Sequence, residues 1–310
     1  MTAERTRSPV AMFVFARPDT TARVLDAVRR ARPSRLLVIG EAPRRGDAEE
    51  EDRCAQVRGL IETVDWDCEV STDYAPEHLS MRERFETGLG WVFSEVPEAI
   101  VLEDDCVPDP SFFHFCDALL ERYRDDERVM SIGGTNIQPD TPTGPDSYYF
   151  SRYPAIWGWA SWSRAWDSHD PGMTAWPELR DGGWVEREFS DPRAVGYWRH
   201  QFEQTFRGDE AWDRAFLFAA LAAGRLHAIP SVNLVSNVGF RADATHTGPE
   251  QRGAMSHLQT SPMELPLRHP AEMRRNAEAD AVTERVAFSG VLDQLFDRLR
   301  TKVQAGQGRG

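Results

Sequence analysis

The sequence predicts an α/β fold in which helices cover both faces of a mostly parallel, doubly wound sheet. Short apolar runs alternate with helical patterns from Val10 to Gly134, as such sheets require. One of these runs, Ala99–Leu102, is uninterrupted, which is typical of a strand buried on both faces. Three carboxylates, Glu103 to Asp105, follow it at once. They therefore lie at the carboxyl end of a strand, where open α/β sheets bind their ligands.

The alternation is read from apolar, β-branched runs for strands and from apolar spacing and capping residues for helices. The expected strands are Val10–Phe15, Leu36–Ile39, Cys68–Ser71, Ala99–Glu103 and Val129–Ile132. The expected helices start near Thr20, Glu49 and Ser80, and a fourth runs from Ser111 to Tyr123.

The second half has a different texture, with many aromatic residues between Tyr148 and Trp184. We expect a helix over Asp209–Gly224 and a strand-like stretch over Leu226–Ser236 that Pro230 interrupts. An amphipathic helix is predicted over Ala279–Val303, where it could dock on the catalytic domain or mediate a homodimer.

Composition excludes several classes of protein. A net charge of −14 over 310 residues argues against nucleic acid or an anionic membrane as the main partner. The four cysteines form no CxxC pair, so they are read as free thiols in a reducing compartment and not as a zinc site. No stretch is long and apolar enough to span a bilayer. A cytoplasmic location is expected, and peripheral membrane contact stays open.

The run Glu103–Asp105 is the strongest candidate for chemistry. Adjacent carboxylates repel one another unless a cation neutralises them, and a hard divalent metal prefers oxygen ligands. If strand geometry continued through the run, Glu103 and Asp105 would share one side and Asp104 would face the other. A solvated acidic loop is the alternative interpretation.

The segment Leu79–Asn136 resembles the GT-A-fold glycosyltransferases. It is closest to bacterial family 2-like enzymes and, more distantly, similar to the Golgi N-acetylglucosaminyltransferase of N-glycan processing. The Glu-Asp-Asp at 103–105 matches the family's variant DxD motif, and a Phe-rich helix follows it. The match extends through Trp157–Trp162 and through Asn233–His246, so it covers about Val10 to Thr247.

The resemblance implies a metal-dependent, inverting glycosyltransferase of glycan or polysaccharide biosynthesis. The donor would be a nucleotide-diphosphate sugar, UDP-linked by expectation, the acceptor a hydroxyl compound, and the cofactor Mn²⁺ or Mg²⁺. In domain terms, residues 1–250 would form the catalytic domain. Within it, residues 10–134 would bind the nucleotide sugar and residues 135–250 the acceptor. Residues 251–310 would be a C-terminal extension with a disordered tail.

Carried over residue by residue, the resemblance makes Asp105 the metal ligand and places Asp104 and Glu103 against the donor. Arg17, after the first strand, and Asp73, after the third, become candidates for binding the nucleoside, although Asp73 could equally be a turn residue.

Arg82 and Arg84 match basic positions of similar bacterial sequences. A guanidinium suits a diphosphate because it stays charged and donates hydrogen bonds in pairs. A solvated helix face explains both arginines equally well.

Asp213 corresponds to the family's general base, which takes the proton of the acceptor hydroxyl. Asp209 and Glu210 are rivals, and Asp209 could instead cap the helix. His246 corresponds to a C-terminal metal ligand and would favour Mn²⁺, although a lone histidine is more often structural.

Most tryptophans of the aromatic region are expected in the core because Trp buries a large area. Trp157 and Trp159, which flank Gly158, are the candidates for an acceptor site.

Two other functions are considered. A sugar-phosphate nucleotidyltransferase shares the sheet architecture but predicts a Gly-rich loop after the first strand. The sequence has Ala16-Arg17-Pro18-Asp19 there, without glycine. The other is a non-catalytic, carbohydrate-binding relative of the transferases.

Overall fold

The computed structural model describes residues 5–138, 143–189, 191–239 and 258–285. Its centre is an eight-stranded sheet, mostly parallel and flanked by helices, with the strand order β3-β2-β1-β4-β8-β6-β9-β7. The strands are β1 Val10–Val14, β2 Arg35–Gly40, β3 Glu69–Tyr74, β4 Glu98–Glu103, β6 Val129–Gly133, β7 Tyr148–Ser151, β8 Trp159–Trp162 and β9 Leu226–Pro230. The predicted α/β class is confirmed.

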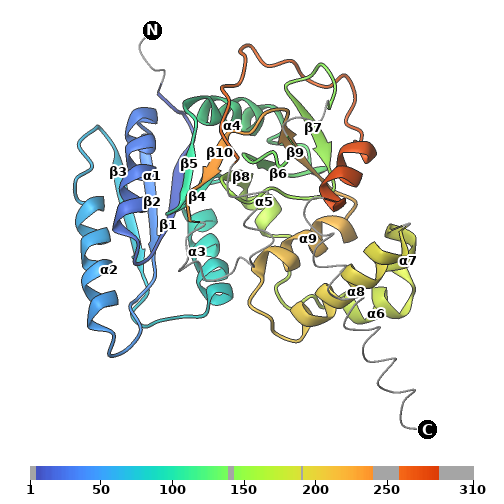
Figure 1. The fold of residues 1–310 in the computed structure, drawn as a ribbon, viewed down its shortest axis with the longest axis horizontal. Helices are drawn as coiled ribbons and strands as arrows, with labels where there is room; N and C mark the ends of the chain where they lie inside the picture. The colour runs from blue at the N-terminus through green and yellow to red at the C-terminus, as the bar shows by residue number, and fades with distance from the viewer. Residues whose placement is uncertain (1–4, 139–142, 190, 240–257, 286–310) are drawn as a thin grey trace.

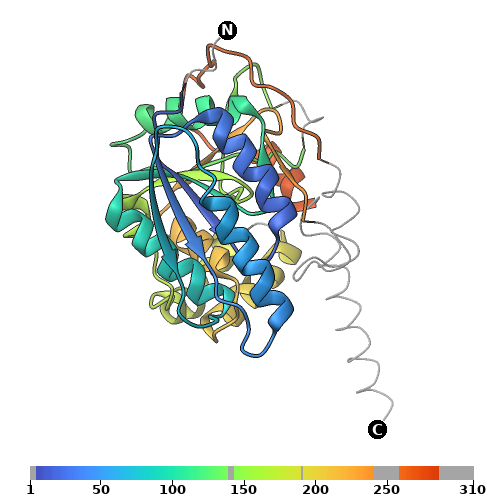
Figure 2. The same ribbon diagram turned by 90° about the vertical axis from the view of Figure 1, so that its left-hand side faces the viewer.

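The N-terminal half of the sheet, β3-β2-β1-β4, is entirely parallel. Its crossover helices are α1 Pro18–Ala31, α2 Ala48–Ile61 and α3 Met81–Glu95. The chain steps outward from β1 to β3 and then returns to β4, and right-handed crossovers therefore put α3 on the opposite face from α1 and α2. Figures 1 and 2 show α1 and α2 lying side by side over the blue strands. Both faces of β1 and β4 are thus covered, which explains their continuous apolar sequences.

The other half of the sheet is mixed, which the sequence analysis did not predict. β8 lies between β4 and β6 and is antiparallel to both, and β7 is antiparallel to β9. Both strands are four residues long and buried throughout, so they lack the alternation that marks a half-exposed strand. The helices nearest this half are α4 Pro110–Arg122 and α5 Ser163–Trp166.

A second core lies beside the sheet, built by residues of the aromatic region and of the chain that follows it. Its helices are α6 Trp176–Asp181, α7 Trp184–Glu188, α8 Pro192–Phe206 and α9 Trp212–Ala222, at the lower right of Figure 1. Trp176, Trp184, Trp198, Phe202 and Phe218 pack their rings edge to face or stacked in this core. The expectation that most tryptophans between Tyr148 and Trp184 are core residues is confirmed for Trp159, Trp162, Trp176 and Trp184, which are buried.

A small two-stranded ribbon and a C-terminal segment complete the fold. β5 Cys106–Pro108 pairs antiparallel with β10 Val235–Asn237, and Asn237 lies opposite Cys106. Residues 277–285 are helical, and their Asp280 is fully buried and accepts a hydrogen bond of 2.5 Å from Ser151 of β7. The predicted helix Ala279–Val303 is described only to residue 285, and its remainder lies outside the described residues.

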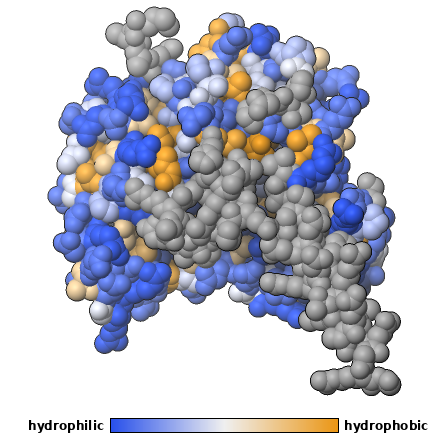
Figure 3. Space-filling model, viewed as in Figure 1, coloured by the Kyte–Doolittle hydropathy of each residue, from blue (hydrophilic) through white to orange (hydrophobic). Residues whose placement is uncertain are grey.

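The face in Figure 3 is mainly hydrophilic, with hydrophobic residues gathered in a band across its middle. None of the helices in the described part of the chain combines the length and the apolar character of a membrane span. All four cysteines are free thiols in this structure, and Cys54, Cys106 and Cys116 are buried.

His227 of β9 makes stability depend on pH. The residue is 0% exposed, and its Nδ1 lies 2.8 Å from the Ser131 hydroxyl. Burial lowers its pKa to about 3. Between pH 6.5 and 3 the unfolded chain therefore binds a proton that the folded protein refuses, and stability falls as the pH falls. The expected slope is about 1.4 kcal/mol per pH unit, or about 2 kcal/mol lost at pH 5.

Chemical denaturation of His227→Gln between pH 7 and 5 should show a correspondingly smaller loss of stability than the parent. His200→Gln, at an exposed position, is the control and should keep the full slope. Equal slopes in all three proteins would contradict this role of His227.

Candidate functional site

A cavity of about 1100 Å³ opens at the carboxyl ends of β1 and β4. Parallel strands end there together, so residues far apart in the sequence meet around one space. The sequence-predicted residues that line it are Arg17, Arg84, Glu103, Asp104, Asp105, Trp157 and Asp213. The solvated-loop interpretation of the acids does not hold, because Asp104 and Asp105 are buried.

The predicted alternation of the three acids is wrong, because β4 ends at Glu103 and the chain turns at Asp104 and Asp105. The turn brings all three carboxylates to the same cavity instead of dividing them between two faces. Asp104 is held by the backbone N–H of Phe15, which donates to its Oδ2 at 3.1 Å. The end of β1 thus fixes the acidic turn that follows β4.

Arg17 is the cation closest to the acids among the described residues. Its Nη1 lies 2.7 Å from Asp105 Oδ2 and 3.6 Å from Asp104 Oδ1. One guanidinium does not offset three carboxylates. Burial and the neighbouring charge of Asp105 raise the pKa of Asp104 to about 7, against the opposing effects of Arg17 and the Phe15 N–H. Burial and the charges of Asp105 and Asp104 also raise the pKa of Glu103 well above its ordinary range.

The β5–β10 ribbon brings distant residues to Asp105. Asn237 Nδ2 lies 3.4 Å from Asp105 Oδ1, and the backbone N–H of Val238 donates to the Asp105 carbonyl at 2.8 Å. Gly239 passes so close that a Cβ there would lie 2.0 Å from Asp105 Oδ2. Position 239 therefore requires glycine for the chain to pass this carboxylate.

The acids fit a divalent cation that takes some of its coordinating atoms from a bound substrate. They offer hard oxygen donors with uncompensated negative charge, which is the chemistry that Mg²⁺ and Mn²⁺ prefer. The described ranges contain no group of three or more His, Cys, Asp or Glu side chains placed to hold a metal by themselves. The protein would therefore supply one or two ligands. Asp105 is the carboxylate that both Arg17 and the β5–β10 ribbon contact. His246, the second predicted ligand, lies outside the described residues.

Arg84 and Asp73, both predicted to bind the nucleotide, are paired with each other. Arg84 Nη2 lies 2.5 Å from Asp73 Oδ2 and 2.9 Å from the Asp73 carbonyl. This pair joins α3 to the end of β3 and leaves Arg84 at the wall of the cavity.

Arg82, also predicted to bind the diphosphate, contacts Glu86 and backbone carbonyls in this structure. Its Nε is 2.8 Å from Glu86, and its Nη atoms donate to the carbonyls of Pro171, Thr205 and Asp209. It ties α3 to the chain that enters α9, and it is not among the residues that line the large cavity.

Asp213 lies in the first turn of α9 and is partly buried. Removal from water raises its pKa, while Arg214 and the N–H groups of the helix start oppose the rise. The helix begins at Trp212 and not at the predicted Asp209. Asp209 instead forms an ion pair with Arg214 at 2.5 Å. The result is a carboxylate inside the cavity with its charge only partly compensated.

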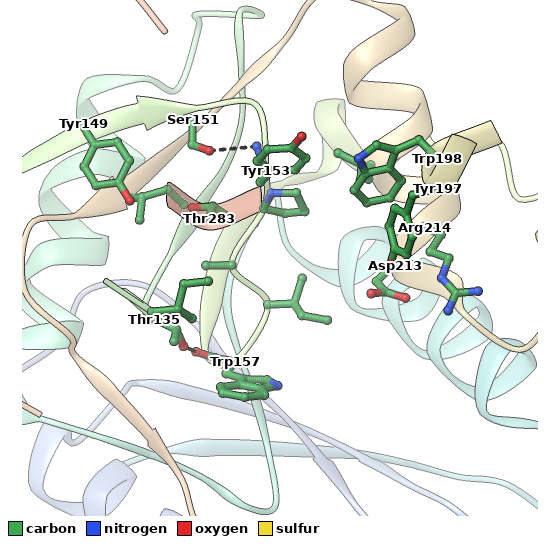
Figure 4. Close-up of a pocket in the computed structure, with 16 residues that line it drawn as sticks. Thr135, Tyr149, Ser151, Tyr153, Trp157, Tyr197, Trp198, Asp213, Arg214 and Thr283 are labelled. Atoms are coloured by element: carbon green, nitrogen blue, oxygen red, sulfur yellow. Dashed lines mark hydrogen bonds between the residues drawn. The ribbon is translucent and has the colours of Figure 1, made fainter. Parts of the chain in front are cut away.

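A second cavity of about 320 Å³ adjoins the first. Ile156, Trp157, Asp213 and Arg214 line both. Figure 4 shows Asp213 below Tyr197 on one side of the second cavity, with Tyr149 and Thr283 on the other. Trp159, predicted beside Trp157 as an acceptor contact, is 2% exposed and stacks on Trp212 in the core, so it reaches neither cavity.

Several lining residues were not predicted from the sequence. Arg44 lies 5.7 Å from the centre of the Phe15 ring, and the His78 ring lies 5.6 Å from that ring, so the three form an aromatic and cationic shelf beyond β1. Arg214 and Asn237 are further lining residues of this kind. Arg214 adjoins Asp213 in sequence and could have been inferred, whereas the shelf depends on loops that carry no distinctive motif.

No family model matches the sequence, and no curated protein matches it. The solved structures that are similar to part of the chain include these two. One is mouse xyloside xylosyltransferase 1 in its apo form, at 12% identity over 70% of this chain and 81% of that chain, with a TM-score of 0.32. The other is a UDP-glucose pyrophosphorylase complexed with UDP-glucose, at 10% identity over 47% of this chain and 62% of that chain, with a TM-score of 0.26. Structures this distant do not assign a function to the chain, so its function has to be inferred from the residues of the site.

Proposed function

We propose that the protein is a glycosyltransferase that moves a sugar from a nucleotide-diphosphate sugar to an acceptor hydroxyl, with inversion and with Mn²⁺ or Mg²⁺ as cofactor. One observation carries the proposal. Asp213 lies where a cavity that contains three carboxylates and Arg17 meets a second cavity that contains none of them. A base at such a junction can serve an acceptor on one side while a charged donor occupies the other.

The large cavity suits a nucleotide-diphosphate sugar. The shelf of Phe15, Arg44 and His78 offers flat surfaces for a base, and Arg17 and Arg84 offer positive charge for phosphates. Asp105, assisted by Asp104, would hold the cation, and a bound cation supplies charge that stabilises the departing diphosphate. UDP is the nucleotide we expect.

The transfer itself needs one base. Asp213 takes the proton of the acceptor hydroxyl while the acceptor oxygen forms a bond to the anomeric carbon. The bond from that carbon to the diphosphate oxygen breaks at the same time, and the diphosphate leaves with the electron pair. A single displacement of this kind inverts the anomeric centre.

The direct test is titration calorimetry of the full-length protein with UDP, with and without Mn²⁺, followed by a screen of UDP-sugars for UDP release. We expect Mn²⁺-dependent UDP binding and release from at least one donor. A purely carbohydrate-binding protein would show no metal-dependent nucleotide binding. Release of nucleoside triphosphate from a UDP-sugar and diphosphate would indicate a nucleotidyltransferase and contradict the proposal.

Replacement of Arg82 can distinguish a positioning role of this residue from a phosphate-binding role. Because its guanidinium ties the chain before α9 to α3, Arg82→Ala should displace Asp213 and lower kcat by about 10- to 100-fold. The affinity for UDP should stay unchanged, since Arg82 does not line the donor cavity. Steady-state kinetics and UDP calorimetry measure the two effects separately. A weaker affinity for UDP with an unchanged kcat would restore the phosphate-binding role that the sequence suggests.

A further inference from the structure

The second cavity identifies the class of acceptor, if the proposed transfer is correct. Its side chains are mainly carbon surfaces, among them the rings of Trp157, Tyr197 and Trp198 and the aliphatic groups of Leu217 and Ile229. Its charged side chains are Asp213 and Arg214, both at the junction with the donor cavity. At about 320 Å³ it is at the small end of ligand cavities, which span roughly 300–1,000 Å³.

Hydroxyl side chains in this wall are already used within the protein. Thr135 donates to the Trp157 carbonyl at 2.8 Å, Ser151 donates to Asp280 at 2.5 Å, and Tyr153 donates to Glu284 at 2.6 Å.

Tyr149 and Thr283 both accept from Gln138 Nε2, at 3.2 and 2.9 Å. The hydroxyl hydrogens of Thr135, Ser151 and Tyr153 are thus already bonded within the protein, whereas Tyr149 and Thr283 use only an acceptor position in these contacts.

A sugar ring carries a hydroxyl on most of its carbons, and each buried hydroxyl without a partner weakens binding. A molecule with one hydroxyl on an apolar ring avoids this loss of binding, because its single hydroxyl can form a hydrogen bond with Asp213. We propose that the acceptor is a small phenol-like or alicyclic alcohol, with its apolar ring in the second cavity and its hydroxyl at Asp213. This differs from the glycan or polysaccharide acceptor that the sequence resemblance implies.

The proposal gives the C-terminal segment a part in the site. Thr283 comes from the helical residues 277–285, and Gln138, Ser151 and Tyr153 hold this helix in place through Ala279, Asp280 and Glu284. The segment thus forms one wall of the acceptor cavity, and Thr283 limits its size (Figure 4).

The test compares two probes of similar size by calorimetry on the full-length protein, 4-methylumbelliferone with one phenolic hydroxyl and methyl β-glucoside with four. We expect the phenol to bind at least about 10-fold more tightly, the equivalent of one unsatisfied buried hydroxyl. Thr283→Trp, which fills the cavity, should weaken phenol binding by 10-fold or more. Ile137→Trp fills it from another element, in case the first variant does not fold. Glu278→Trp is the matched control, because Glu278 is exposed on the same helix. This variant should bind the phenol as tightly as the parent protein does.

Equal or tighter binding of the glucoside, or undiminished phenol binding by both cavity-filling variants, would overturn the acceptor proposal. Titration with UDP and Mn²⁺ tests the donor side in the same samples. Loss of phenol selectivity with intact UDP binding counts against the acceptor class alone, and absent UDP binding counts against the proposed transferase.

Discussion

Asp105→Ala should lower sugar transfer by about 100-fold or more and remove the effect of Mn²⁺ on UDP binding. Loss of one preorganised charged group at a transferring centre typically costs this much. Arg17 would then turn to Asp104, already 3.6 Å away, and the cation would lose the carboxylate proposed as its main ligand. The measurements are UDP release at saturating Mn²⁺ and UDP calorimetry with and without the metal.

The same variant should keep its thermal stability or gain some. Burial, and after it the charge of Asp105, raises the pKa of Glu103 and of Asp104, so removing that charge relieves both carboxyl groups. Asp125→Ala, at an exposed carboxylate outside both cavities, is the control and should retain full activity. Wild-type turnover by Asp105→Ala would disprove the metal assignment, whereas a large fall in melting temperature would indicate a structural role.

Asp213→Asn should lower kcat by about 10²- to 10⁴-fold, the usual contribution of a general base. Asparagine keeps the shape of the side chain but cannot take the acceptor proton. Binding of UDP with Mn²⁺ should be unaffected, because the donor is held by other residues. Glu210→Gln, which changes a rival carboxylate of the same cavity, is the matched control. If Glu210→Gln lost as much activity as Asp213→Asn, the base would be misassigned.

The pH dependence of kcat gives Asp213 a second signature. The base must be ionised, so the rate falls as the pH falls through its pKa, which removal from water raises above the ordinary aspartate value. Arg214 lowers that pKa, and Arg214→Gln should therefore shift the acidic limb of the profile to higher pH. An acidic limb that stays in place would indicate that another group limits the rate.

The sequence was sufficient for the parts of the fold that have local signals. The strand at Ala99–Glu103 is buried on both faces, and its sequence is therefore an apolar run. The start of the next helix is indicated by the capping residue Asp109 and by Pro110. β7 and β8 were missed because their four-residue, fully buried sequences carry no period. α8 was not predicted, although Asp191 and Pro192 mark its start.

Part of the candidate site was predicted as individual residues, but not the interactions between those residues. Asp105 and Asp213 came from the resemblance, and both line the cavity. Asn237 and Asp105 are 132 positions apart, and their contact depends on the pairing of β5 with β10. The sequence around either residue contains no pattern that indicates this contact. Arg82 and Arg84 are two positions apart on one helix and therefore face different sides of it. Arg82 ties loop carbonyls together, and Arg84 pairs with Asp73. No property of the two side chains distinguishes them in advance.

The helix of residues 277–285 has a consequence for changing the substrate range of this protein. It reaches the second cavity through Thr283 and contributes nothing to the lining of the first. The two cavities share Ile156, Trp157, Asp213 and Arg214 as lining residues. A library of variants restricted to this helix can therefore enlarge, narrow or make polar the space beside Asp213 without altering a residue of the acidic turn. The sheet supplies the reactive groups, and a separately mutable segment at the end of the described chain sets the size of the space they face.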